Sequence, residues 1–166
     1  MSTFGQGVII YPLAKIIRDE HLQIGDFSTV DDFVFLDGGT GTRIGRYVHI
    51  GNHVSIFGGG ELEIGDYAVV AAGSRILTAT DTDHDGARMS THLPDEYRHV
   101  VRAKVTIGRD AFVGANSVVL PGVNLAEGCV VGAGSVVTGD LDAWTVYAGT
   151  PARPLRARNR PSRPGP

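Results

Sequence analysis

Aliphatic residues recur at intervals of six along most of the chain. The first series ends at Ile76 and has a step of eight after every third member, whereas the second series begins at Ile107 and keeps to steps of six. These positions, called anchors below, are Phe4, Ile10, Ile16, Ile24, Val30, Leu36, Ile44, Ile50, Ile56, Ile64, Val70, Ile76, Ile107, Val113, Val119, Leu125, Val131 and Val137. A fixed period constrains a fold more strongly than local propensity does.

Three steps of six describe one coil with three short, flat faces and with the anchors pointing inward. A small or β-branched residue follows many anchors four positions later, as Ser28 follows Ile24. A single coil cannot bury its own inner face, so coils must stack, with neighbouring strands ~4.8 Å apart. We therefore expect an all-β fold, a parallel β-helix of triangular cross-section. An antiparallel sandwich is the alternative, but alternating strands predict a period of two.

The repeat is interrupted between Ile76 and Ile107, which are 31 positions apart. Residues 77–104 break the inward pattern, so we expect them to leave the column as one protruding loop. A loop of this length is usually functional or disordered. The glycine-rich segments 37–41 and 57–61 hold the two extra residues of the earlier coils at the same corner. These segments and the loop should form one ridge along the column.

The chain leaves the repeat beyond Val137. Thr150 and Pro151 resemble an N-cap and a first helical position, which predicts a short C-terminal helix. Residues 159–166 are basic and proline-rich, so we expect a disordered tail. The predicted organisation is one domain, residues 1–158, followed by this tail.

Composition narrows the functional classes. The net charge is −3 and the pI is about 6.0, which gives no reason to expect nucleic acid as a partner. The single cysteine, Cys129, excludes an intrachain disulfide, and its apolar neighbours predict core packing, with a catalytic thiol as the alternative. We find no leader and no long apolar run, so we expect a cytoplasmic protein that does not contact a membrane.

His84 lies inside the interruption, between Asp83 and Asp85. Imidazole is the usual base near neutral pH, and a carboxylate on its second nitrogen fixes the tautomer. An acidic, solvated loop with an incidental histidine is the plain alternative. The position of His84 in the break of a regular scaffold favours a functional histidine, whereas we expect His99 to be an ordinary surface residue.

The chain resembles the left-handed β-helix (hexapeptide-repeat) acyltransferases, and within them the sugar and galactoside O-acetyltransferases most closely. The resemblance rests on the hexapeptides, on the Asp83-His84-Asp85 loop, on the run 113–123 and on the ending 147–153, and it covers roughly residues 4–158. Left-handed winding is implied by the family and does not follow from the spacing.

The resemblance implies a homotrimer whose active sites lie between neighbouring subunits, with acetyl-CoA along the C-terminal coils. It implies that His84 is the general base on the acceptor, and sequence proximity makes Asp83 and Asp85 the candidates for orienting it. Contacts with acetyl-CoA are implied for Ala115, Ala133, Thr138, Gly139, Arg153 and Arg156.

The acceptor-binding candidates are Asp37, Asn52 and His53, with His49 beside them. The plain alternative for the two histidines is a surface or subunit contact. We expect direct transfer of acetyl to a sugar hydroxyl. N-acetylation of a nucleotide-linked amino sugar or of another small acceptor ranks second, because many amino-sugar enzymes carry a preceding nucleotide-binding domain that is not recognisable here.

A metal protein like the γ-class carbonic anhydrases, or a non-catalytic β-helix module, is a further alternative. Three histidines can hold zinc, and His49, His53 and His84 are available. Here the close pair comes first and the distant histidine follows, whereas the carbonic anhydrases place the single histidine first. We therefore expect no metal.

Overall fold

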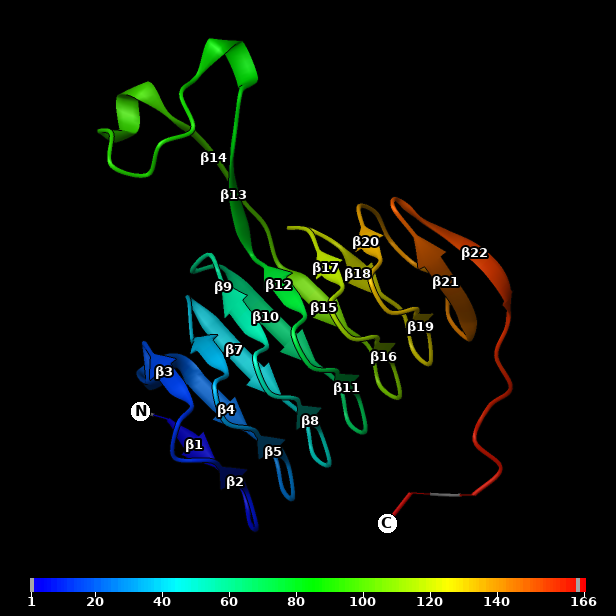
Figure 1. The fold of residues 1–166 in the computed structure, drawn as a ribbon. Helices are drawn as coiled ribbons and strands as arrows, with labels where there is room; N and C mark the ends of the chain where they lie inside the picture. The colour runs from blue at the N-terminus through cyan, green and yellow to red at the C-terminus, as the bar shows by residue number, and fades with distance from the viewer. Residues whose placement is uncertain (1, 164) are drawn as a thin grey trace.

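The computed structural model describes residues 2–163 and 165–166, which form a column of stacked strands with one projecting arm (Figure 1). Anchors pair from coil to coil as the spacing predicts: Ile24 lies opposite Ile44, and Ile44 lies opposite Ile64. From Ile24 onward every anchor is at most 4% exposed. The expected parallel β-helix is confirmed, and the anchors form its core.

Three parallel sheets make the faces of the column. Sheet A contains β1 (Thr3–Phe4), β4 (Leu22–Ile24), β7 (Gly41–Ile44), β10 (Glu61–Ile64), β15 (Val105–Ile107) and β18 (Asn124–Leu125). Sheet B contains β2 (Ile9–Ile10), β5 (Thr29–Val30), β8 (His49–Ile50), β11 (Val69–Val70), β16 (Phe112–Val113), β19 (Val130–Val131), β21 (Thr145–Gly149) and β22 (Ala152–Ala157), of which β22 is antiparallel. Sheet C contains β3 (Lys15–Ile17), β6 (Phe35–Asp37), β9 (Ser55–Phe57), β12 (Arg75–Leu77), β17 (Val118–Val119) and β20 (Val136–Val137). The edges where the chain passes between sheets are called AB, BC and CA.

Inward serines satisfy backbone carbonyls at the corners. Ser28 Oγ donates to the carbonyl of Gly45 at 2.8 Å and accepts from the N–H of Val48 at 2.9 Å. Ser74 Oγ donates in the same way to the carbonyl of Gly114 at 3.0 Å. A buried hydroxyl is costly without a partner, so these bonds explain how small polar residues can line the column.

Edge CA carries the ridge that the spacing predicts, and its first coil adds a 3-10 turn, η1 (Asp19–His21). The N–H of Thr78 donates to the carbonyl of Phe57 at 2.9 Å, and Thr78 Oγ1 accepts from the N–H of Gly60 at 2.9 Å. The N–H of Ala103 returns to the carbonyl of Thr78 at 3.0 Å. The interruption therefore leaves and rejoins the column directly beside segment 57–61.

The interruption is an ordered arm that projects from the column (Figure 1). β13 (Ala79–Thr82) and β14 (His99–Arg102) form its antiparallel stem, and the 3-10 turns η2 (His84–Gly86) and η3 (Asp95–Tyr97) lie beyond them. The prediction that this segment leaves the column is confirmed. Within the described residues no helix is long and apolar enough to cross a membrane.

The short helix expected after Thr150 is wrong. Thr150 and Pro151 lie in the connection between β21 and β22, and β22 is the last strand of sheet B. Pro154 lies opposite Tyr147 in this hairpin. An edge strand accepts proline because the missing N–H faces no further strand, so a Pro-rich segment that resembled a first helical turn could extend the sheet instead.

Candidate functional site

Four of the six candidate acyl-CoA positions border the C-terminal end of sheet C. Ala115 and Ala133 lie on edge BC in successive coils, where the N–H of Gly134 donates to the carbonyl of Ala115 at 2.8 Å. Thr138 and Gly139 follow β20 on edge CA, and a Cβ at Gly139 would meet no atom within 4 Å. The two pairs thus lie on opposite sides of the last strands of sheet C.

Arg153 and Arg156 lie on β22. Arg153 pairs with Ala148 and Arg156 with Val146, with a bulge between them. Because Ala148 and Val146 are two residues apart on β21, both arginines lie on one face of the hairpin. Both are exposed, and no carboxylate in the described chain pairs with either. The two arginines therefore share a face of a bulged strand, where the sequence predicted a short helix.

His84 begins η2 near the end of the arm. Its Nε2 lies 3.3 Å from Asp85 Oδ2, and the two side chains are 64% and 90% exposed. Asp83 precedes the turn and makes no side-chain cap. The geometry therefore favours Asp85 over Asp83 as the neighbour of His84, but in this single chain the contact is solvated and orients the ring only weakly.

Two contacts of the arm were not predicted from the sequence. The His99 ring lies 4.7 Å from the His84 ring, and His99 Nδ1 lies 2.8 Å from Thr82 Oγ1. Arg98 forms a bidentate ion pair with Asp81. The hydrogen bonds from Arg98 lower the pKa of the Asp81 carboxyl. Both contacts require the pairing of β13 with β14, and the sequences Ala-Thr-Asp-Thr and His-Val-Val-Arg show no alternation of apolar and polar residues that would have predicted it.

Two cavities accompany the arm. One, of about 400 Å³, lies along its far part and is lined by His84, Arg88 and His99 among others. The other, of about 340 Å³, lies between the ridge and the stem, where Phe57 and Asp81 contribute to its wall. The arm thus presents histidine and arginine side chains beside spaces that a small molecule can enter.

The acceptor candidates do not form one cluster within the chain. Asp37 is 6% exposed and accepts from Arg18 Nε at 2.6 Å and from the N–H of Gly39 at 2.9 Å, on edge CA. Asn52 and His53 lie on edge BC, where His53 stacks on Phe33 with 5.0 Å between ring centroids. Asp37 therefore stabilises the ridge on edge CA, whereas Asn52 and His53 lie at the opposite edge of sheet C.

The remaining candidates for chemistry make separate contacts. His49 Nε2 lies 2.9 Å from Asp31 Oδ2 on the outside of sheet B. In the part of the chain that the structure describes, no three His, Cys, Asp or Glu side chains gather as a metal site. Burial raises the pKa of the Cys129 thiol to about 12, so the thiolate needed for a nucleophile is negligible near pH 7.

Comparisons of sequence place the chain among known enzymes. The family model described as a hexapeptide repeat of succinyl-transferase matches residues 104–139. The dTDP-4-amino-4,6-dideoxy-D-glucose acyltransferase of Escherichia coli is 35% identical over 160 residues, which cover 96% of this chain and 83% of that relative. The galactoside O-acetyltransferase of Escherichia coli strain K12 is 26% identical over 145 residues, covering 87% and 68%.

Solved structures extend this similarity to three dimensions. A variant of AntD, an N-acyltransferase from Bacillus cereus, in complex with dTDP and coenzyme A superimposes with a TM-score of 0.91 at 33% identity. That match covers 95% of this chain and 84% of AntD. A second AntD variant holds dTDP-4-amino-4,6-dideoxyglucose and coenzyme A. With 95% of the chain covered, the match must include most of the arm as well as the coils.

Proposed function

The chain belongs to the hexapeptide-repeat acyltransferases, and from that premise we propose that it transfers an acyl group from acyl-CoA to the amino group of a nucleotide-linked amino sugar. Acetyl-CoA is the first donor to consider. The observation that carries this proposal is the 35% identity, over 96% of the chain, to an acyltransferase whose acceptor is such a sugar. The galactoside O-acetyltransferase shares 26% identity over a smaller part.

This ranking reverses the one expected from the sequence, which placed the sugar hydroxyl first. That order depended on a nucleotide-binding domain that many amino-sugar enzymes carry before their coils. The match to the amino-sugar acyltransferase spans 83% of that relative. Most of an enzyme of this kind can therefore consist of the coil region alone, and the lack of a recognisable extra domain does not argue for a hydroxyl acceptor.

An amine changes what the protein must supply. Simple amines have pKa values of ~8–10, so the acceptor arrives mainly as an ammonium ion and must lose a proton before it attacks. Once neutral, it is a stronger nucleophile than a hydroxyl and needs a weaker base. The nitrogen forms a bond to the thioester carbon, the carbon–sulfur bond breaks, and the coenzyme leaves as a thiolate that takes up a proton.

We assign the acceptance of the amine proton to His84. Its Nε2 faces Asp85 Oδ2 at 3.3 Å, so a proton held on Nε2 leaves Nδ1 as the basic nitrogen. Under this assignment Asp85 orients the ring, and Asp83 shapes the turn. Asn52 and His53 are exposed polar positions that we assign to acceptor binding. Asp37 is assigned an indirect role, because it stabilises the ridge beside the acceptor.

We propose that the enzyme is a homotrimer with sites between subunits. His84 is 64% exposed on an arm that projects from its own column (Figure 1). Acyl transfer benefits from a surface that excludes water, and a neighbouring subunit can supply one. In this arrangement the arm of one subunit faces the C-terminal coils of the next, where Arg153 and Arg156 bind phosphate groups of the coenzyme.

The test is an assay with acetyl-CoA and dTDP-4-amino-4,6-dideoxyglucose. Thiol release reports turnover, and mass spectrometry of the product reports the added acetyl group. Mild alkali distinguishes the two linkages, because an ester is hydrolysed under conditions in which an amide survives. We expect an alkali-stable product. Turnover with galactosides but not with amino sugars contradicts the proposal.

A further inference from the structure

Edge AB lies away from the residues assigned to catalysis and carries a ladder of aromatic rings. Phe27, Tyr47 and Tyr67 hold the same corner position in successive coils, with φ of 57°, 56° and 61°. Their ring centroids are 5.1 and 5.6 Å apart along the ladder. The guanidinium of Arg109 covers the last ring, 5.0 Å from its centroid. Stacking and cation–π contacts therefore fix this edge over three coils.

The ladder is interrupted where Asp110 and Gly128 hold the corner position, and it resumes at Trp144. Arg158 spans this gap. Its backbone N–H donates to the carbonyl of Trp144 at 2.6 Å, and its Nη1 donates to the carbonyls of Asp110 at 2.6 Å and Gly128 at 3.0 Å. Its Cζ lies 5.6 Å from the centroid of the Trp144 ring. One side chain thus connects three successive coils.

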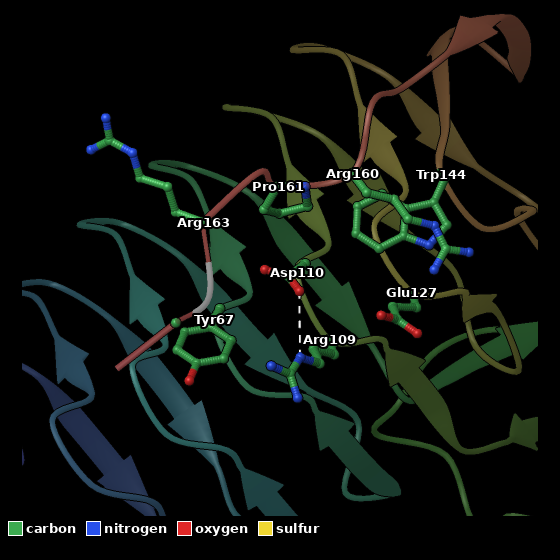
Figure 2. A pocket seen from close by; sticks show the side chains of 9 residues that line it. Tyr67, Arg109, Asp110, Glu127, Trp144, Arg160, Pro161 and Arg163 are labelled. Carbon is green, nitrogen blue, oxygen red and sulfur yellow. Dashed lines mark ion pairs between the residues drawn. The ribbon is translucent and has the colours of Figure 1, made fainter.

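A cavity of about 500 Å³ lies beside this contact (Figure 2). Its aromatic walls are already covered by the chain's own cations, because Arg109 lies over Tyr67 and Arg160 lies 5.1 Å from the centroid of Trp144. Arg109 also pairs with Asp110 at 3.4 Å. The tail crosses here, and Tyr67 Oη donates to the carbonyl of Pro166 at 2.9 Å. These contacts favour an internal attachment of the chain end over a ligand site.

The strand that directly precedes this attached chain end, β22, carries the two arginines assigned to the coenzyme. β22 ends sheet B, and in the described chain it pairs with β21 alone. Arg158 directly follows Ala157, the last residue of β22. The end of this edge strand is therefore held on one side by β21 and at its terminus by the hydrogen bonds of Arg158.

We propose that Arg158 is a positioning residue for acyl-CoA binding: by fixing the end of β22 on edge AB, it holds Arg153 and Arg156 in place for the phosphates of the coenzyme. This inference rests on the proposed function. A strand that is ordered before binding avoids the loss of conformational freedom on binding. Arg158 therefore affects the KM for acyl-CoA, whereas the chemical step on the arm proceeds at its normal rate.

The test is Arg158→Ala, examined by steady-state kinetics and by hydrogen exchange. We expect the KM for acetyl-CoA to rise about tenfold, with kcat within about twofold of wild type, and faster exchange of the β22 amides. Arg158→Lys keeps the charge but lacks the forked donor group, so we expect an intermediate KM. This variant also serves as the test if the alanine protein does not fold.

Arg160→Ala is the matched control, because Arg160 covers the same Trp144 ring but lies outside β22 and, within the described residues, donates no hydrogen bond to the corner carbonyls. We expect its KM and β22 exchange to equal those of wild type. Wild-type protein that binds acyl-CoA, together with an Arg158 variant whose KM and β22 exchange are unchanged, overturns the positioning role alone. Wild-type protein that does not bind acyl-CoA overturns the proposed function together with it.

Discussion

Arg98 donates two hydrogen bonds to the carboxylate of Asp81, at 2.8 and 3.0 Å, and both side chains are at most 15% exposed. Asp81 belongs to β13 and Arg98 immediately precedes β14, so the pair closes the stem of the arm. Bidentate arginine–carboxylate pairs fix geometry as well as charge. The position of His84 therefore depends on a contact made within the arm, across its stem.

Asp81→Asn should loosen the arm without unfolding the column, because the coils pair with one another independently of the arm. We expect faster hydrogen exchange across residues 79–102 and a lower kcat/KM. The hydrogen bonds from Arg98 lower the pKa of Asp81. The ion pair is therefore complete at pH values above the usual pKa of aspartate, and it is lost as the pH falls through the lowered pKa. The arm should loosen in wild type only at acidic pH.

Asp95→Asn is the control for this substitution. Asp95 also lies near Arg98, at 3.7 Å, but its side chain is fully exposed. An exposed pair of this kind contributes little, so exchange and activity should equal those of wild type. Equal exchange in the Asp81 and Asp95 variants would show that the pair does not hold the arm.

His84→Ala should lower kcat by a factor on the order of 10²–10⁴, the usual contribution of a general base. Acetyl-CoA binding, measured by calorimetry, should be unchanged, because the coenzyme is assigned to the C-terminal coils. His92→Ala is the control, since His92 is an exposed histidine of the same arm. Near-normal turnover of the His84 variant rules out its assignment as the base.

Gly39→Ala should destabilise the ridge. Gly39 has φ of +55°, and an added Cβ would lie 2.1 Å from the carbonyl oxygen of Gly60. The strained backbone alone costs about 1–3 kcal/mol, so urea unfolding should show at least that loss in the free energy of unfolding. Gly41→Ala is the control, because a Cβ there would meet nothing within 4 Å. Equal stabilities of the two variants would contradict this account of the ridge.

Charge reversal at Arg153 and Arg156 should raise the KM for acetyl-CoA well above any change in kcat, at least about tenfold. Both arginines lie on one face of the hairpin, so the proposed coenzyme site can use both. Arg163→Glu reverses the charge of an arginine in the tail, outside β22, and should leave the KM for acetyl-CoA unaltered. An unchanged KM in the double variant removes these residues from the coenzyme site.

The column could be predicted from spacing because one physical requirement repeats at every anchor. Each anchor must point inward, and each coil must stack on the next, so the pairing of Ile50 with Val70 follows from the period. The ridge followed from the same count, because the extra residues of 37–41 and 57–61 fall on the corner from which the arm leaves. Periodicity sets the register of strands that obey it.

Residues outside the period could not be placed in the same way. The contact of Asp81 with Arg98 depends on the antiparallel stem, and neither residue belongs to a hexapeptide. The helix expected after Thr150 was wrong because a first helical turn and an edge strand tolerate the same prolines. The roles proposed for His84, Asn52 and His53 depend on the proposed trimer, and the spacing within one chain carries no information about contacts between subunits.

The central claim is that the acceptor group is an amine, and a matched pair of sugars tests it most directly. The measurement is kcat/KM with acetyl-CoA for dTDP-4-amino-4,6-dideoxyglucose and for the analogue with a hydroxyl at the same carbon. Sites built for one hydrogen-bonding group can reject its replacement by factors of ~10⁴. We predict that the amine is preferred by at least about 10², with an amide as product. Equal or greater kcat/KM for the hydroxyl analogue, with an ester as product, contradicts the account.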